Sequence, residues 1–163
     1  MSRTGSMTRR RFAATLAGAA CLVGASRRVF AAEHFEVTHS DAQWRELLGP
    51  ERYEILRQGG TEPAFSSPLL NEKRAGTYRC AGCELALFSS RVKYDSGDGW
   101  PSFWDVLPRT TATQNDYALL EQRTEVHCRR CGGHLGHIFD DGPPPTHLRY
   151  CIDGLALRFV PAS

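Results

Sequence analysis

Apolar residues recur at helical spacing in the stretch that follows Ser40. The spacing predicts a first short helix, which Ser40 can cap and Gly49 can end, with an apolar stripe of Trp44, Leu47 and Leu48. Pro50 suits the start of a second short helix, which stops at Gly59-Gly60 and has its apolar residues at Tyr53, Ile55 and Leu56. We expect the two helices to pack as a flap on the main body.

Beyond these helices, polar and apolar residues alternate in short runs, which predicts strands joined by turns. Residues 61–74 contain Pro63 and Pro68 and predict an extended, irregular connection, and residues 140–145 predict a turn. The predicted strands are Thr77–Arg79, Glu84–Phe88, Tyr117–Leu120 antiparallel to Arg123–His127, and a strand pair within Leu148–Val160 that turns at Asp153-Gly154.

A stretch rich in aromatic residues, Asp95–Trp104, is broken by glycine and proline and cannot form regular structure. It carries Trp100 and Trp104. Such a loop either plugs the core, as large aromatic side chains mostly do, or forms one wall of a binding pocket. The sequence leaves both possibilities open.

The 163 residues suffice for one domain, and the first 32 have the layout of an export signal. Paired arginines precede Phe12, and the apolar run that follows, of roughly 14 residues, is too short to span a bilayer as a helix. We therefore expect a Tat-type signal peptide at residues 1–32, cleavage near Ala31 or Ala32, and a periplasmic single domain at residues 33–163. An uncleaved anchor, or a lipoprotein with Cys21 as the lipid acceptor, is the alternative.

Removal of the signal changes the charge balance. Residues 1–32 contain six of the 20 basic residues and no acidic residue, so 14 basic and 18 acidic residues remain. The net charge changes from +2 for the whole chain to −4 for the mature domain. A mildly acidic domain without a basic run is unsuited to binding nucleic acid or an anionic membrane as its main function.

Four of the six cysteines form two Cys-x-x-Cys pairs, Cys80 with Cys83 and Cys128 with Cys131, which are 44 residues apart. This spacing suits a tetrahedral site for one structural Zn²⁺ per chain. In an oxidising compartment the same pairs could instead form disulfides. Because Tat substrates fold before export, the zinc could be loaded in the cytoplasm.

Cys151 is the one cysteine of the expected mature chain outside these pairs. Arg149 precedes it by two residues, lies on the same side of an extended strand, and would favour a thiolate. His134 and His137 supply further titratable groups upstream. Cys151 is therefore either a nucleophile or a small buried apolar residue, which free cysteines often are.

Three motifs occur in order along the mature chain: Lys93-Tyr94-Asp95-Ser96-Gly97-x-Gly99-Trp100-Pro101-Ser102-Phe103, His134-Leu135-Gly136-His137-Ile138-Phe139-x-Asp141-Gly142-Pro143, and Arg149-Tyr150-Cys151-Ile152. Together they resemble the motifs of the B-type methionine sulfoxide reductases, over a region from about Trp44 to Phe159. The resemblance implies a mainly β fold of two antiparallel sheets, a β-tent, with short N-terminal helices and a structural zinc held by four cysteines.

The resemblance also implies reduction of the R epimer of methionine sulfoxide, free or in proteins, as a repair of oxidised proteins. The implied site has Cys151 as the nucleophile, His134, His137 and Arg149 around the sulfoxide, and Trp100, Phe139 and Asp153 at the substrate.

The chemistry fits these residue types. Sulfoxide sulfur is electrophilic, so the Cys151 thiolate can attack it while His137, with His134 behind it, protonates the departing oxygen. Arg149 would stabilise developing negative charge, and Trp100 and Phe139 would accept the S-methyl group. The products are methionine and a sulfenic acid on Cys151.

The chain departs from the family pattern at two positions. Asp98 lies where many members have a resolving cysteine, so the usual intramolecular disulfide cannot form there. We therefore expect reduction by an external thioredoxin-like protein or a small thiol. We also expect a monomer. Asp153 stands where the family usually has asparagine, and its carboxylate should oppose thiolate formation unless it is paired or protonated.

Two other functions stay open on the sequence alone. A zinc-ribbon module that binds protein or nucleic acid would leave Cys151 buried and inert. A different sulfur-handling enzyme on the same zinc fold would use Cys151 on another substrate, and substrate profiling would distinguish it.

Overall fold

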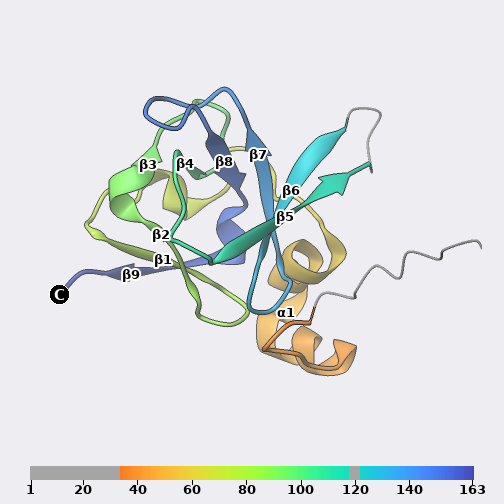
Figure 1. The fold of residues 1–163 in the computed structure, drawn as a ribbon. Helices are drawn as coiled ribbons and strands as arrows, with labels where there is room; N and C mark the ends of the chain where they lie inside the picture. The colour runs from red at the N-terminus through yellow and green to blue at the C-terminus, as the bar shows by residue number, and fades with distance from the viewer. Residues whose placement is uncertain (1–33, 118–121) are drawn as a thin grey trace, which may run out of the picture. The chain divides into compact units, whose positions relative to one another are not determined.

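The computed structural model describes residues 34–117 and 122–163 of the chain. Nine strands in this part form two antiparallel sheets, so the fold is mainly β, as the resemblance implied (Figure 1). The smaller sheet has the order β2-β1-β9, formed by β1 (Gly76–Cys80), β2 (Ala86–Ser89) and β9 (Leu157–Pro161). The larger sheet has the order β3-β4-β8-β7-β6-β5, formed by β3 (Lys93–Tyr94), β4 (Ser102–Phe103), β5 (Thr111–Asp116), β6 (Arg123–Cys128), β7 (His134–Phe139) and β8 (Arg149–Ile152).

One α-helix, α1 (Asp41–Gln58), precedes the sheets in the described chain. It starts with a capping box, in which the Ser40 hydroxyl accepts from the Gln43 N–H and the Gln43 side chain accepts from the Ser40 N–H. Gly49, with φ 70° and ψ 171°, is not helical and, with Pro50, divides α1 into the two short helical parts that the sequence predicted. The second part ends at Gly59 in the left-handed conformation.

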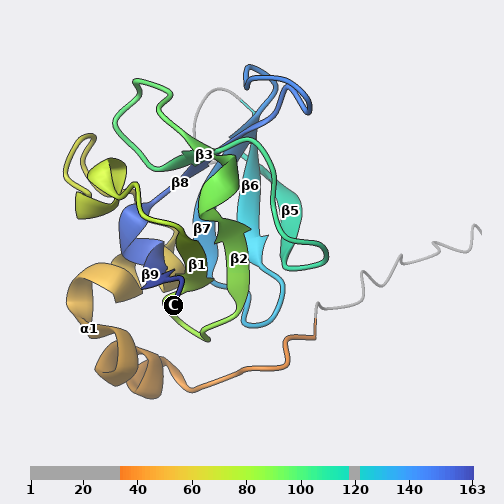
Figure 2. The same ribbon diagram turned by 90° about the vertical axis from the view of Figure 1, so that its left-hand side faces the viewer.

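The buried side of α1 belongs to the hydrophobic core. The helix contacts β7 and the turn η3 (Gly154–Ala156), and Figure 2 shows it on the side of β9. Leu48 is buried but Leu47 has 57% of its surface exposed, so the predicted place of Leu47 in the apolar stripe is wrong. Neighbouring residues on a helix point about 100° apart, and here Leu48 faces the core while Leu47 faces solvent. No helix of the described residues is long and apolar enough to cross a bilayer.

The first predicted strands are confirmed with one shifted boundary. Thr77–Arg79 lies within β1, whereas the strand expected at Glu84–Phe88 begins only at Ala86. Glu84 has a positive φ of 61° and belongs to the turn after Cys83. The connection at residues 61–74 is irregular as expected, apart from the short 3₁₀ helix η1 (Pro68–Asn71).

Arg123–His127 does not pair with Tyr117–Leu120 as expected. The partner of β6 is β5, in which Asp116 lies opposite Arg123. Tyr117 follows β5 with 68% of its surface exposed, and residues 118–120 lie outside the described residues. β5 is an edge strand that reads Thr-Ala-Thr-Gln-Asn-Asp, so it lacks the apolar alternation by which a strand is found from sequence.

The pairing expected between the two strands within Leu148–Val160 is also wrong. Both strands exist, but β8 pairs with β4 and β7, whereas β9 pairs with β1 in the other sheet. The turn η3 redirects the chain between the sheets, so no hairpin forms. Alternation identifies a strand but does not identify its partner.

Aromatic side chains join the two sheets. Phe103 on β4 stacks on Phe88 of β2 at a centroid distance of 4.3 Å and meets Tyr78 of β1 edge-on at 5.0 Å. All three are fully buried, which contributes about 2–3 kcal/mol for each ring. The aromatic loop is therefore partly a core plug, through Phe103.

Candidate active site and candidate metal centre

Strand pairing places the side chains of the site on one face of the larger sheet. Cys151 on β8 lies directly opposite Ser102 on β4 and His137 on β7, and His137 lies opposite Glu125 on β6. Directly opposed residues of antiparallel strands project to the same side, with Cβ atoms about 4.5–5.5 Å apart. The register thus brings His137 next to Cys151.

A β-bulge in β7 brings His134 to the same face. Residues three apart in a regular strand point to opposite faces. Here the pairing with β6 passes from Gly136 directly to His134 and leaves Leu135 as the extra residue. As a result, the rings of His134 and His137 meet edge-on with centroids 5.4 Å apart.

The bulge requires a glycine. Gly136 has φ 146°, and a Cβ atom there would overlap the backbone oxygen of Cys151. Glycine is the residue that tolerates both the conformation and the close approach of β8.

A cavity of about 120 Å³ lies over this face. It brings together five of the residues singled out from the sequence, namely Trp100, His137, Phe139, Cys151 and Asp153. Trp100 is thus one wall of a pocket, so the aromatic loop has both of the roles considered above. His134 and Arg149 lie beside this cavity without lining it.

Three lining residues were not singled out from the sequence, namely Thr61, Arg123 and Gly136, of which Gly136 lies within a quoted motif. Arg123 precedes Glu125 by two residues on β6, so the period of a strand could have placed it on the same face. Thr61 belongs to an irregular segment, in which no periodic signal exists.

The two Cys-x-x-Cys pairs form equivalent turns. In the first, the Glu84 N–H donates to the Cys80 carbonyl at 2.9 Å, and in the second, the Gly132 N–H donates to the Cys128 carbonyl at 2.8 Å. Glu84 and Gly132 both have positive φ, 61° and 68°. Each turn therefore presents two sulfur atoms toward the other turn.

The four sulfur atoms of Cys80, Cys83, Cys128 and Cys131 lie within 4.8 Å of one another and suit a metal ion. Cys80 Sγ is 3.7 Å from Cys131 Sγ, and Cys83 Sγ is 3.5 Å from Cys128 Sγ. A tetrahedron with metal–sulfur distances of about 2.3 Å has edges of about 3.8 Å. None of the five cysteines among the described residues forms a disulfide, so the geometry fits a four-thiolate metal site.

Comparison with known proteins agrees with these features. The SelR domain matches residues 48–161. The peptide methionine sulfoxide reductase MsrB of Agrobacterium fabrum (strain C58) is 51% identical over 127 residues, which cover 77% of this chain and 94% of that protein. The proteins of the same name from Leptospira interrogans and Methanosarcina barkeri are 51% and 48% identical, and the matches cover 77% and 76% of this chain and 97% and 87% of those proteins.

The chain belongs to the MsrB family. The three motifs quoted above all lie within the matched region, and the four clustered cysteines do as well. Family membership favours the enzyme over the zinc-ribbon binding module that the sequence left open.

In this MsrB-family protein, burial dominates the acidity of the candidate nucleophile. Burial raises the pKa of Cys151 to about 11. Arg149 lowers this pKa, as expected of a nearby cation, while the carboxylates of Asp98 and Asp153 raise it. The free protein therefore holds Cys151 as a neutral thiol at pH 7, contrary to the lowered pKa that the sequence suggested.

Arg149 is shared between two carboxylates. Its Nε and Nη2 donate to Asp141 at 2.7 Å each, and its Nη1 pairs with Asp98. The guanidinium also lies over the ring of Phe139, 4.4 Å from its centroid. Because Asp98 and Asp141 draw on the same cation, less of its field acts on Cys151.

Both histidines are held by carboxylates. His137 Nε2 lies 2.8 Å from Asp116 Oδ2, the same oxygen that accepts from Arg123 at 2.7 Å. Burial lowers the pKa of His137, so its ring is neutral at pH 7. His134 Nδ1 lies 2.6 Å from a Glu125 oxygen.

Asp153 lies just beyond β8 and is buried, with 3% of its surface exposed. Burial raises its pKa to about 6, so it is mostly ionised at pH 7. It accepts from the Glu62 N–H at 2.8 Å rather than pairing with Arg149. The carboxylate is consequently not neutralised by the arginine of the site.

Proposed function

We propose that this protein reduces the R epimer of methionine sulfoxide, free or in oxidised proteins, to methionine. The observation that carries this function is the cavity in which Cys151 lies opposite His137 and beside Trp100 on the scaffold of the MsrB family. The relatives named above are peptide methionine sulfoxide reductases. A small, largely apolar cavity next to a thiol suits a methyl sulfoxide.

The first step requires a thiolate, and His137 is placed to generate it. Both groups are neutral in the free protein at pH 7, because burial raises the pKa of Cys151 and lowers that of His137. We infer that the Cys151 proton passes to His137 once substrate is bound, as in other cysteine–histidine pairs. Asp116 stabilises the imidazolium through its bond to Nε2.

The thiolate then attacks the sulfoxide sulfur. His137 returns the proton to the sulfoxide oxygen. The resulting hydroxyl group moves to Cys151 as the S–O bond and the transient bond between Cys151 Sγ and the substrate sulfur break. The substrate sulfur gains two electrons and leaves as methionine, while Cys151 loses two electrons and becomes a sulfenic acid. Arg149 stabilises the negative charge that develops on the oxygen, and Trp100 and Phe139 contact the S-methyl group.

Two external thiols complete the cycle. The first attacks the sulfenic acid, forms a mixed disulfide with Cys151 and releases water. The second releases Cys151 and leaves as part of the external disulfide. An intramolecular partner is lacking among the described residues, because Asp98 holds the usual resolving position and the other four cysteines face one another. The reductant is a thioredoxin-like protein or a small thiol.

We assign Zn²⁺ to the four-cysteine site. Cys80, Cys83, Cys128 and Cys131 would hold the ion as thiolates, where it acts as a structural cross-link. Sulfur-only ligation and closely spaced sulfur atoms support zinc over a hard cation such as Mg²⁺. The ion has no place in the chemical steps above.

We also propose export through the Tat route, with residues 1–32 as the signal and residues 33–163 as a monomeric periplasmic enzyme. The paired arginines and the short apolar run support this proposal. Replacing Arg10 and Arg11 with lysine should leave the full-length precursor in the cytoplasmic fraction of a Tat-competent bacterium. Unchanged appearance of the mature protein in the periplasm would remove the Tat assignment.

The reaction is tested with separated R and S epimers of a blocked methionine sulfoxide. The purified domain is incubated with dithiothreitol, and methionine formation is followed by chromatography beside the Cys151→Ser variant. We expect turnover of the R epimer alone and none in the variant. A folded, metal-loaded protein that reduces neither epimer would overturn the proposed function.

The missing resolving thiol has its own test. With one equivalent of the R epimer and no reductant, mass spectrometry should find one sulfenic acid on Cys151, trapped by dimedone, and one methionine per chain. A disulfide between Cys151 and any other cysteine would sink the external-thiol scheme.

A further inference from the structure

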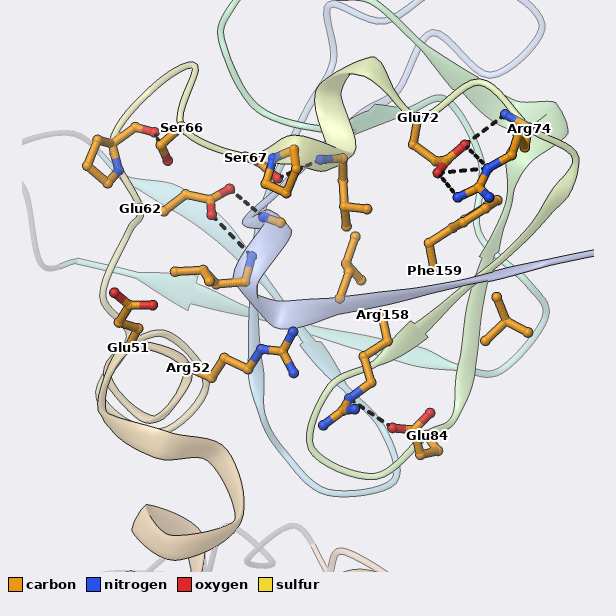
Figure 3. Close-up of a pocket in the computed structure, with 17 residues that line it drawn as sticks. Glu51, Arg52, Glu62, Ser66, Ser67, Glu72, Arg74, Glu84, Arg158 and Phe159 are labelled. Carbon is orange, nitrogen blue, oxygen red and sulfur yellow. Dashed lines mark hydrogen bonds and ion pairs between the residues drawn. The ribbon is translucent and has the colours of Figure 1, made fainter.

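A second cavity lies on the other side of the segment that carries Thr61. This groove has a volume of about 880 Å³ and is bounded by α1, residues 62–74, η3 and β9 (Figure 3). Glu62 lines it, whereas its neighbour Thr61 lines the cavity at Cys151. The wall between the two cavities is therefore the main chain around Glu62.

The side chain of Glu62 is a buried carboxylate that the reaction does not use. Only 4% of its surface is exposed, and burial raises its pKa. Its Oε1 accepts from the Gly154 N–H and its Oε2 accepts from the Leu155 N–H at 3.1 Å, as the dashed lines of Figure 3 show. A buried carboxylate with two backbone donors is fixed in place, because breaking either bond leaves a buried polar group unpaired.

The turn that supplies these donors packs closely against Ser67. A Cβ atom on Gly154 would overlap the hydroxyl oxygen of Ser67. Gly154 follows Cys151 by three residues, so the anchored turn is continuous with the strand that carries the nucleophile.

The main chain of Glu62 holds two groups of the active-site cavity. Its N–H donates to Asp153 Oδ1 at 2.8 Å, and its carbonyl accepts from Trp100 Nε1 at 3.0 Å. Residues 61–63 belong to no helix or strand, so no ladder of hydrogen bonds keeps them in position. The side-chain anchor therefore helps to fix both main-chain groups, together with the bond from the Phe65 N–H to the Gly99 carbonyl at 2.7 Å.

We propose that Glu62 is a positioning residue: its carboxylate anchors residues 61–63 to the turn after β8, and its main chain thereby holds Trp100 and Asp153 at the substrate cavity. The inference rests on the proposed function for its kinetic consequence alone. The geometric consequence, the position of the Trp100 indole, can be measured without substrate.

The test compares Glu62→Gln with Glu72→Gln. Glutamine has one acceptor oxygen, so one of the two N–H donors at Glu62 loses its partner. Glu72 is a suitable control because it lines the same groove and accepts from the N–H and guanidinium of Arg74 without contacting Trp100 or Asp153. We expect Glu62→Gln to raise KM for the R epimer about tenfold and to lower kcat less. The reason is that the Trp100 side chain, which contacts the S-methyl group of the substrate, is displaced.

The second readout is the indole N–H signal of Trp100 in ¹H–¹⁵N spectra, assigned with Trp100→Phe. Glu62→Gln should shift this signal and speed its exchange with solvent, while Glu72→Gln leaves it unchanged. If wild type shows no turnover, the proposed function fails and the indole signal still decides the role of Glu62. An unchanged indole signal and unchanged KM in Glu62→Gln, even with lowered stability, would overturn the positioning role.

If Glu62→Gln does not fold, Glu62→Asp provides a second test. Glu62→Asp keeps the charge but shortens the side chain by one methylene group, so it can retain at most one of the two bonds. The same rise in KM and the same change at the Trp100 indole are expected. Wild-type values for both in Glu62→Asp would contradict the proposal as decisively.

Discussion

The thiol of Cys151 is subject to opposing effects. Burial raises its pKa to about 11, Arg149 lowers it, and Asp98 and Asp153 raise it further. Asp98 acts twice, because its carboxylate repels the thiolate and also pairs with Arg149. Asp98, which replaces the usual resolving cysteine, therefore also reduces the stabilisation that Arg149 gives to the Cys151 thiolate.

This balance predicts how the free thiol responds to pH. A pKa above the usual value makes the thiolate scarce at neutral pH and increases it as pH rises toward 11. The rate of Cys151 alkylation by iodoacetamide, followed by mass spectrometry, should therefore rise about tenfold per pH unit from pH 7 to 9. Asp98→Asn should raise the rate at pH 8 about threefold or more, whereas the exposed Asp105→Asn should not. A plateau in the wild-type rate below pH 8 would contradict this account.

Asp153 provides a second prediction at the same scale. Its pKa is about 6, so it is ionised above that pH and then opposes the thiolate. Asp153→Asn should therefore raise the reduction rate at pH 7.5, and the advantage should vanish as the pH falls through 6. The amide oxygen can still accept from the Glu62 N–H, so the fold should be unchanged. Equal rates for the two proteins at pH 7.5 would remove this role.

Among the elements, β7 does most to assemble the site. Its bulge places His134 and His137 on one face, and its neighbour β8 presents Cys151 to that face. The irregularity removes one residue from the regular pairing and places a second histidine next to His137. A regular strand with the same two histidines would send one of them away from Cys151.

Gly136→Ala tests the bulge. The added methyl group would overlap the Cys151 carbonyl, so we expect a loss of about 2 kcal/mol or more in the free energy of unfolding in urea, together with loss of activity. Gly97→Ala is the control, since Gly97 also has positive φ but a methyl group added there would meet no atom within 4 Å. It should cost about 1 kcal/mol from backbone conformation alone. Similar losses in both variants would show that close approach is not the constraint.

Across the molecule, the four-cysteine site lies between the two sheets. Cys80 is the last residue of β1 in the smaller sheet, and Cys128 is the last residue of β6 in the larger sheet. A metal bound by both turns therefore links the sheets at one end, while Phe103, Phe88 and Tyr78 join them within the core.

Metal removal should thus act on the whole fold. Exhaustive chelation, or Cys128→Ser, should lower the free energy of unfolding by about 4 kcal/mol or more and abolish activity with it. Elemental analysis should find one zinc per wild-type chain, and adding zinc back should restore the chelated protein but not the variant. A metal-free protein with full stability and full activity would rule out the structural role.

The sequence by itself determined the parts of this protein that depend on neighbours in the chain. The helix ends were located by the capping residues and by Gly49 with Pro50. The two cysteine turns were located by the Cys-x-x-Cys spacing. Each of these signals acts within about five residues. The three motifs identified the family. Together with Asp153, which follows the third motif, they contain the five residues that the sequence singled out at one cavity. A local motif can be found without knowing which distant residues contact it in the folded protein.

Only the tertiary structure decided the features that depend on residues far apart in the sequence. In the structure, the partner of β6 is the polar strand β5, β8 and β9 belong to different sheets, and Leu47 faces solvent. The structure also reversed the expected pKa shift of Cys151 and revealed Arg123 and Glu62. Strand partners, burial and electrostatic fields are set by packing between distant segments, so the sequence pattern of one segment cannot specify them.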